Sequence, residues 1–210
     1  MFSKIKRFLI FGSLFFLVVG FAMTGGFFAR RYMERQTQLK VMARFEEKLH
    51  SDHQLDNDHA YIGSYTAQLL PADGETIAIL SLDRLGIKVS VVQGIDKDAL
   101  RISAGKFPQS ADAGFGNFAI AGHSSRLYVC LFNDLHRAKI GDVIYVDTNT
   151  GRHKYLVSEM RVIEPTDTSV LDPTKESILS IITCTNDGAQ RLYIKGIEVY
   201  SNIRSASTHS

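Results

Sequence analysis

The sequence predicts an all-β domain preceded by one membrane-spanning helix. From about Ile77 onward, short apolar segments of β-type composition recur every eight to twelve residues, and few helical stretches interrupt them. Such a rhythm is typical of an antiparallel sandwich or barrel. At the other end of the chain, the segment from Phe8 to Ala29 contains 22 residues without a charge.

The apolar segment is long enough to cross a bilayer, since roughly 20 apolar residues span the hydrocarbon core. It exceeds the roughly 7–15 apolar residues of a signal peptide, although the small residues of "FAMTGG" are compatible with cleavage. No face of the segment is polar, which argues against a buried helix of a soluble protein. We expect an uncleaved membrane anchor. Basic residues lie on both sides of it, so charge alone leaves its orientation open.

The pattern divides the chain into five parts: an N-terminus at 1–7, a transmembrane anchor at 8–29, a juxtamembrane helix and linker at 30–76, a β-domain at 77–200 and a polar tail at 201–210. Good helix formers fill residues 30–49. From His50 the sequence is rich in His, Asp and Asn, and we expect a linker there. The spacing of these residues fits neither a zinc module nor an EF-hand loop, so a solvated linker is favoured over a metal site.

Seven segments of the β-domain are expected to be strands: "TIAILSLDRL", "IKVSVVQG", "GNFAIAGH", "DVIYVDT", "HKYLVSEMRVIEP", "ILSIITC" and "RLYIKGIEVY". A hairpin turn is predicted in "DTNTGRHKY", with Gly151 at a position of positive φ. Residues 96–108 and 127–139 are the two expected short helices.

Composition excludes some classes of function. The net charge is +2, there is no tryptophan, and no basic stripe follows the first 48 residues, so a nucleic-acid partner is not expected. The two cysteines form no CxxC metal pattern.

Three residues could form a site for cysteine chemistry. Cys184 ends one apolar strand, His123 follows a glycine at the end of another, and Arg191 opens the strand after Cys184. A thiolate attacks carbonyls, an imidazole can protonate a leaving amine, and a guanidinium can hold an oxyanion. Each residue also has an ordinary interpretation, namely a small buried thiol, a surface histidine and a solvated arginine. The short connection places Cys184 opposite Arg191 in a hairpin, whereas the position of His123 does not follow from spacing.

The segments "SIITCTNDGAQRL" and "GNFAIAGHSS" resemble the two signatures of sortases, a strand ending in Thr-Leu-x-Thr-Cys before an arginine and a strand ending in Ala-Gly-His. The resemblance covers about 120 residues, from Ile77 to Tyr200, and includes "VVQGIDKDALRISAGKFPQSADAGFGN". It departs from the signature at Ser180-Ile181, where Thr-Leu is usual. This likeness implies a closed eight-stranded β-barrel with its active site at one end of a groove.

The resemblance also implies the chemistry. Cys184 is the expected nucleophile, His123 the general acid/base and Arg191 the stabiliser of the substrate backbone and oxyanion. Thr183 and Ser124 are weaker candidates for substrate binding. The expected reaction cleaves an LPxTG-like sorting signal between Thr and Gly through a thioacyl intermediate, which an amine then resolves. No cofactor or metal is expected; some members bind calcium, but no acidic cluster here can be assigned to it.

Partners and location follow from the same resemblance. The expected partners are surface proteins with a sorting signal, a peptidoglycan precursor or other amine, and lipids of the cytoplasmic membrane. The domain should lie outside the cell and the N-terminus in the cytoplasm. The basic residues that follow the anchor are awkward for this orientation, and binding to anionic headgroups is one use for them.

A class A- or D-like anchoring enzyme is preferred over a pilin-polymerising class C enzyme. Residues 50–76 contain no Asp-Pro-aromatic lid motif, and the tail at 201–210 is polar. Two alternatives remain besides pilin polymerisation: a membrane-anchored cysteine protease that releases its product to water, and a non-enzymatic anchored β-domain. Cys130 is expected to be a buried, inert thiol, the alternative being a disulfide with Cys184 that would stop the enzyme.

Overall fold

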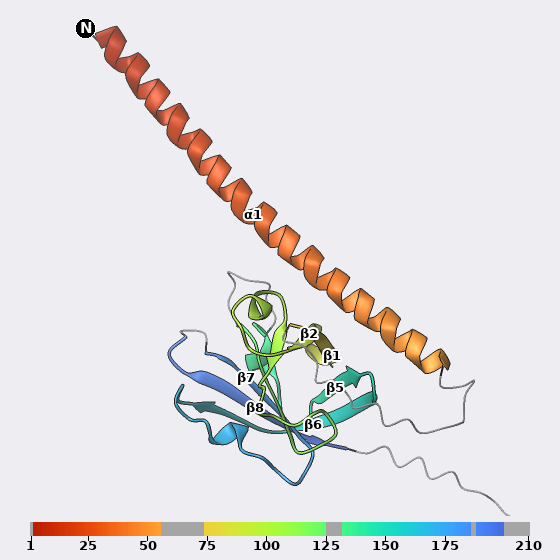
Figure 1. Cartoon of the computed structure of the whole chain (residues 1–210). Coiled ribbons are helices and arrows are strands. Elements are labelled where there is room, and N and C mark those ends of the chain that lie inside the picture. The colour runs from red at the N-terminus through yellow and green to blue at the C-terminus, as the bar shows by residue number, and fades with distance from the viewer. Residues whose placement is uncertain (1, 56–73, 125–131, 186–187, 200–210) are drawn as a thin grey trace, which may run out of the picture.

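The computed structural model describes residues 2–55, 74–124, 132–185 and 188–199, which form one long helix and a closed β-barrel (Figure 1). The strands are β1 (Thr76–Leu82), β2 (Ile87–Gln93), β3 (Ala104–Lys106), β4 (Asn117–Ala121), β5 (Val143–Thr148), β6 (Gly151–Ile163), β7 (Ile178–Cys184) and β8 (Arg191–Glu198). Around the barrel their order is β1-β2-β3-β4-β7-β8-β6-β5, and β5 closes the barrel against β1. The predicted eight-stranded barrel is confirmed.

Two strand pairs depart from the antiparallel pattern that the sequence favoured. β2 pairs with β3 in parallel, and β4 pairs with β7 in parallel, while the other neighbours are antiparallel. The parallel β4–β7 pair brings two distant strand ends to the same rim of the barrel.

All seven expected strand segments form strands, but the eighth strand was expected to be helical. In residues 96–108, only Ala99–Arg101 forms a short 3-10 turn (η2), and β3 follows it. β3 is three residues long, too short for a periodic signal. A side chain at Gly105 would lie 2.3 Å from the Gly94 carbonyl oxygen, so this strand depends on a glycine. In residues 127–139 the described part contains only the 3-10 turn Leu135–Arg137 (η3).

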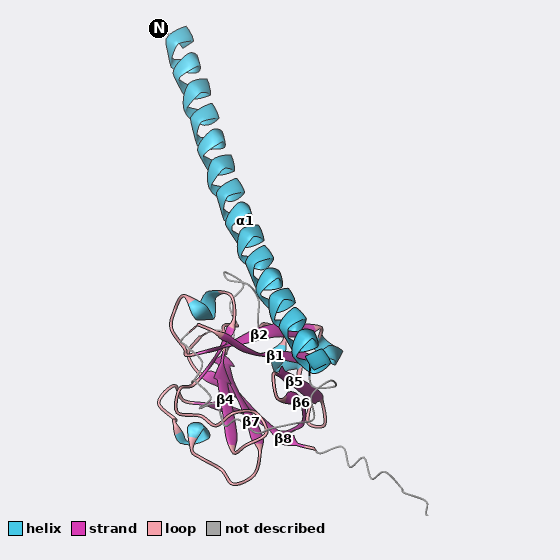
Figure 2. Ribbon diagram, turned by 45° about the vertical axis from the view of Figure 1, so that its right-hand side comes forward, coloured by secondary structure: helices cyan, strands magenta, loops and turns pink. Residues whose placement is uncertain are grey.

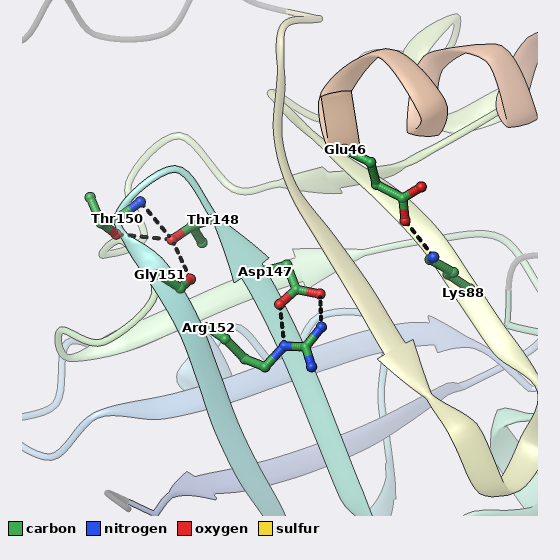
Figure 3. Close-up of polar contacts among 7 residues, drawn as sticks. All are labelled: Glu46, Lys88, Asp147, Thr148, Thr150, Gly151 and Arg152. Carbon is green, nitrogen blue, oxygen red and sulfur yellow. Dashed lines mark hydrogen bonds and ion pairs between the residues drawn. The ribbon is translucent and has the colours of Figure 1, made fainter. Parts of the chain in front are cut away.

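The predicted hairpin turn is confirmed. Thr148 pairs with Gly151 across a two-residue connection, and Gly151 has a φ of 136°. The Thr148 hydroxyl donates to the Gly151 carbonyl at 2.9 Å, and the Arg152 guanidinium binds both carboxylate oxygens of Asp147 (Figure 3).

Alternation along the strands separates the core from the outer face of the barrel. Phe118 and Ile120 of β4, with Leu179 and Ile181 of β7, point into the main core. The residues between them point outward. Near β7 and β8, a second apolar cluster covers the outer face of the barrel. It is built from Ile163, Val170 and Tyr193, with Leu171 and Ile182 beside it.

The helix α1 runs without a break from Phe2 to Leu55. It therefore continues through His50–Leu55, where we expected a linker to begin. Between Leu14 and His50, α1 contains a stretch long and apolar enough to cross a membrane. Large apolar side chains such as Phe16 and Phe21 are more than three-quarters exposed on it, at 76% and 78%, which is costly in water and suits lipid.

The second half of α1 packs on the outside of the barrel, over β1 and β2 (Figure 2). Met42 and Phe45 are buried against Ile79, an outward-facing residue of β1. Two ion pairs flank this contact: Glu46 with Lys88 of β2 at 2.5 Å (Figure 3) and Glu34 with Arg101 of η2 at 2.6 Å. The apolar first half of α1 therefore continues directly into the second half, which packs on the barrel.

Candidate active site

The ends of three strands meet at one rim of the barrel. Because β4 and β7 are parallel, with Ala121 opposite Ile182, both end on the same side. His123 follows β4 there, and Cys184 is the last residue of β7. β8 runs antiparallel to β7, and Arg191 is the Cα partner of Cys184. The expected hairpin pairing of Cys184 and Arg191 is therefore observed, and the parallel β4–β7 pair supplies the position of His123.

The side chains of Cys184 and Arg191 lie on the outer face of the barrel. Cys184 has the same parity along β7 as Ile182, and Arg191 the same parity along β8 as Tyr193, and both of these neighbours belong to the outer apolar cluster. The intervening Thr183 is buried. Strand alternation therefore directs the thiol and the guanidinium away from the barrel core.

A cavity of about 270 Å³ lies on this face, and His123, Cys184 and Arg191 all line it. Its lining also includes residues of the connection between β6 and β7, of η2 and of the segment after β3. Most of the wall is apolar: Leu100, Phe107, Ile163, Pro165, Val170, Leu171 and Ile182. An apolar groove with a few convergent polar groups is the usual form of a ligand site.

His123 is partly buried, and this burial lowers the pKa of its imidazole below the ordinary value of 6.5. Its backbone is fixed on both sides. The His123 carbonyl accepts a hydrogen bond from the Phe132 N–H at 3.1 Å, and the Gly122 N–H donates to the Ile182 carbonyl at 3.2 Å. Neutral imidazole is favoured, which suits a group that takes up and returns a proton.

Gly122 precedes the histidine because a larger residue does not fit. A Cβ at this position would lie 2.4 Å from the ring of Phe132, which is 1% exposed. The glycine thus lets Phe132 pack beneath the turn that presents His123.

Cys184 is a free, partly buried cysteine at the last position of β7. Two hydroxyls fix the chain around it. Ser124 Oγ donates to the Cys184 carbonyl at 2.6 Å, and Thr183 Oγ1 donates to the Gly122 carbonyl at 2.7 Å. Both hydroxyls join the end of β4 to the end of β7. In this structure Thr183 and Ser124 position the backbone, and their binding of substrate stays a prediction.

Arg191 lies over the connection that joins β7 to β8. Its Nη1 donates to the carbonyls of Gly188 at 3.2 Å and Gln190 at 3.0 Å. These bonds use one nitrogen of a guanidinium that carries five N–H donors. The group is therefore held at the cavity with donors left for a ligand's carbonyl or oxyanion.

Two carboxylates of the β6–β7 connection, Glu164 and Asp167, also line the cavity, and the sequence analysis did not single them out. Glu164 accepts a hydrogen bond from Gln190 Nε2 at 2.7 Å, which ties this connection to the one beside Arg191. Ser169 donates its hydroxyl and its N–H to Asp167 and lowers the pKa of that carboxyl. No strand or motif pattern marked these residues.

A second cavity of about 160 Å³ also borders Cys184. Cys184 and Thr183 line both cavities, and Ser124 and His136 line the second.

The described residues contain no group of three or more His, Cys, Asp or Glu side chains that could hold a metal ion. Cys130, which we expected to be inert, lies outside the described residues.

Comparison with known proteins gives one consistent family. The model of the sortase domain matches residues 80–199. Sortase A of Listeria monocytogenes is 32% identical over 109 residues, which is 52% of this chain and 48% of that protein. The chain thus spans about half the length of this curated relative.

Solved structures agree with that family. The Sortase D5 transpeptidase of Clostridium perfringens superposes with a TM-score of 0.65 at 26% identity, covering 79% of this chain and 99% of that one. Sortase A of Listeria monocytogenes superposes with a TM-score of 0.56 at 26% identity, covering 60% and 88%. The two similar structures belong to different sortase classes.

Proposed function

Because this chain belongs to the sortase family, we propose that it is a membrane-anchored cysteine transpeptidase in which Cys184 is the nucleophile, His123 the general acid/base and Arg191 the oxyanion stabiliser. The observation that carries the proposal is the meeting of these three side chains in one cavity of about 270 Å³ at the shared rim of β4, β7 and β8.

The first half-reaction forms a thioester. Neutral His123 takes the proton of the Cys184 thiol, and the resulting thiolate attacks the carbonyl carbon of the threonine in an LPxTG-like sorting signal, so that the electron pair of the C=O bond moves to oxygen. The Arg191 guanidinium stabilises that oxyanion. When the tetrahedral intermediate collapses, the Thr–Gly C–N bond breaks, and the imidazolium of His123 protonates the departing glycine amine.

The second half-reaction reverses these roles. The amine of a peptidoglycan precursor attacks the thioester carbonyl, neutral His123 takes its proton, and the C–S bond breaks to regenerate the thiolate. The lowered pKa of His123 supports this use, because an imidazole that is easily deprotonated can act as a base at neutral pH.

The apolar cavity walls support a peptide substrate. Leu100, Val170 and Leu171 line the same cavity as Cys184, and their apolar surface suits the Leu and Pro of the sorting motif. The polar rim formed by Glu164 and Asp167 is the proposed source of preference at the variable motif position.

The anchor and its orientation complete the proposal. Residues 8–29 would span the cytoplasmic membrane once, with residues 1–7 inside the cell and the catalytic barrel of residues 77–200 outside, where surface proteins and cell-wall amines meet. The exposed apolar side chains of α1 support the membrane span, and the orientation follows from the resemblance alone. No cofactor is required by the proposed chemistry.

A peptide assay tests the proposal. Full-length protein is incubated with a panel of LPxTG-like peptides that vary all five positions, with and without an oligoglycine amine. Cleavage between Thr and Gly, with capture of the amine and loss of both activities in Cys184→Ala, is the expected result. Release to water without amine capture would show a protease instead, and full activity in Cys184→Ala would contradict the enzyme assignment.

A further inference from the structure

Asn117, the first residue of β4, is buried beside the β6–β7 connection, and the proposed chemistry gives it no role. It is 3% exposed. It has the same parity along β4 as Ala121, which lines the cavity of about 270 Å³, so its side chain lies on the outer face of the barrel. Its amide nitrogen Nδ2 donates to the carbonyls of Val170 at 2.9 Å and Asp172 at 3.0 Å. The side chain therefore joins the start of β4 to the connection.

The two carbonyls lie at the end of the 3-10 turn Ser169–Leu171 (η4). Inside the turn, the backbone N–H groups donate to the two carbonyls that precede Val170. A further turn would bond the Val170 carbonyl to the N–H of residue 173, but Pro173 has no N–H. The Asn117 amide thus supplies a donor that the sequence of the turn cannot supply.

The amide of Asn117 occupies this position despite a cost in free energy. Its oxygen Oδ1 is buried and has no hydrogen-bond partner among the described residues. A buried acceptor without a partner is unfavourable, so an apolar side chain of similar size would fill the same space at lower free energy. The favourable contribution of Asn117 therefore lies in the two bonds that its Nδ2 donates, and these bonds hold η4.

The turn η4 forms part of the apolar wall of the cavity. Val170 is 7% exposed and belongs to the outer apolar cluster, and both Val170 and Leu171 line the cavity. The carbonyls that Asn117 binds belong to Val170 and to the residue after Leu171, so they bracket both wall residues. One strand, β4, therefore holds the wall from its first residue and leads to His123 at its other end.

We propose that Asn117 is a positioning residue for substrate selection, which holds Val170 and Leu171 in the wall that receives the leucine of an LPxTG-like motif. This inference rests on the proposed function, because it requires a peptide in the cavity. Asn117 does not line the cavity itself, so it acts through η4. Without its donors the wall moves and the apolar pocket widens, which weakens discrimination between large and small apolar side chains.

Hydrogen exchange tests the hold on η4 without any substrate. Asn117→Leu removes both donors and keeps most of the volume. The N–H groups of Leu171 and Asp172, which are hydrogen-bonded in the parent, should exchange several-fold faster in the variant. Ser90→Ala is the matched control, since it loses a buried hydroxyl bond to Ser103 at 2.9 Å outside the cavity, and it should leave these two amides unchanged. Unchanged exchange in Asn117→Leu would overturn the proposal.

Cleavage kinetics of the full-length protein test selection. An LPxTG-like peptide is compared with the same peptide carrying alanine in place of its leucine. We expect the parent to prefer leucine by about tenfold or more in kcat/KM. In Asn117→Leu this preference should fall several-fold, mainly through a higher KM for the leucine peptide, whereas Ser90→Ala should keep it. An equal loss on both peptides would show general damage to the site and overturn the role in selection, as would a parent without the preference.

A double-mutant cycle tests whether Asn117 acts through the wall. Val170→Ala alters the wall directly and should lower the same preference. Because both substitutions affect one contact, their losses in the double variant should be clearly less than additive, and full additivity would overturn the proposal. Should Asn117→Leu not fold, Asn117→Ser takes its place, since its hydroxyl can donate to only one of the two carbonyls.

The two measurements separate this inference from the proposed function. A parent that cleaves neither peptide would contradict the proposed function, and the exchange of the η4 amides would then decide alone whether Asn117 holds the wall. A parent that cleaves the leucine peptide, together with an Asn117→Leu variant of unchanged preference, would leave the proposed function intact and overturn the role of Asn117.

Discussion

The hydroxyl of Ser124 donates to the carbonyl of Cys184 at 2.6 Å and joins two positions that are 60 residues apart in the sequence. One of them adjoins His123, and the other is the proposed nucleophile. This hydrogen bond therefore sets the relative position of the two strand ends that carry the proposed catalytic pair.

Ser124→Ala should reduce activity more than stability. Loss of one such hydrogen bond lowers the free energy of unfolding by about 1 kcal/mol, whereas a small displacement of His123 relative to Cys184 should lower kcat by about tenfold or more. Peptide-cleavage kinetics and denaturant unfolding measure the two effects. Ser158→Ala is the matched control, since it loses a hydroxyl bond to the Lys195 carbonyl outside the cavity. If both variants lost activity equally, the positioning role of Ser124 would be wrong.

Arg191→Lys should lower kcat by about 10²–10³ with a small change in KM, because removing an oxyanion donor raises the barrier of the chemical step. The ammonium of lysine keeps the charge but lacks the planar donors that bind the Gly188 and Gln190 carbonyls and face the cavity. Steady-state cleavage and transfer rates measure the effect. Arg152→Lys, whose guanidinium binds Asp147 outside the cavity, should remain close to the parent in activity. Full activity in Arg191→Lys would show that the guanidinium takes no part in the mechanism.

Gly122→Ala should destabilise the barrel by about 1–3 kcal/mol, because the added methyl group meets the buried Phe132 ring. Activity should fall as well, since the same turn presents His123. Denaturant unfolding and cleavage rates check both results. Combining Gly122→Ala with Phe132→Leu should recover part of the activity by making room for the methyl group. A single variant that unfolds like the parent would show that the ring moves aside without cost.

His123 should make the barrel less stable in mild acid. Its folded pKa lies below the unfolded value of 6.5 because of burial, so the unfolded chain binds the proton more readily. The contribution of neutral His123 to stability is present above pH 6.5 and is lost as the pH falls through the folded pKa. The melting temperature of the parent should therefore fall more steeply below pH 6.5 than that of His123→Gln. An NMR titration of His123 that gave a pKa above 6.5 would reverse this expectation.

Local pattern was sufficient for most of the barrel but not for all of it. The seven segments with alternating or continuous apolar residues form strands, since each is long enough to show its period. β3 was missed because three residues show no period and its strand depends on a close backbone contact at Gly105. The end of α1 was placed too early, because the polar residues after His50 do not stop a helix by themselves.

The candidate site was predictable to different degrees. The pairing of Cys184 with Arg191 depends only on the short connection between their strands, so nearby sequence was enough to predict it. The approach of His123 depends on the parallel pairing of β4 with β7, which spacing does not encode, and only the resemblance to sortases supplied it. Glu164 and Asp167 come from a connection without a strand pattern, and the packing of Ile79 against α1 is likewise non-local.

The unbroken course of α1 has a consequence for which substrates can be processed. Glu34 lies five residues beyond Ala29, roughly 7.5 Å along the helix, and holds Arg101 beside Leu100 of the cavity wall. In the proposed function, the unbroken helix would therefore set the distance between the bilayer and the bond that Cys184 attacks. A substrate protein whose sorting motif is held closer to the bilayer than this distance would not be cleaved, whatever the sequence of its motif. Inserting three or four residues after Ala29 should change the spacing between membrane segment and sorting motif at which a substrate is cleaved fastest. An unchanged optimum would show that the length of α1 does not select substrates.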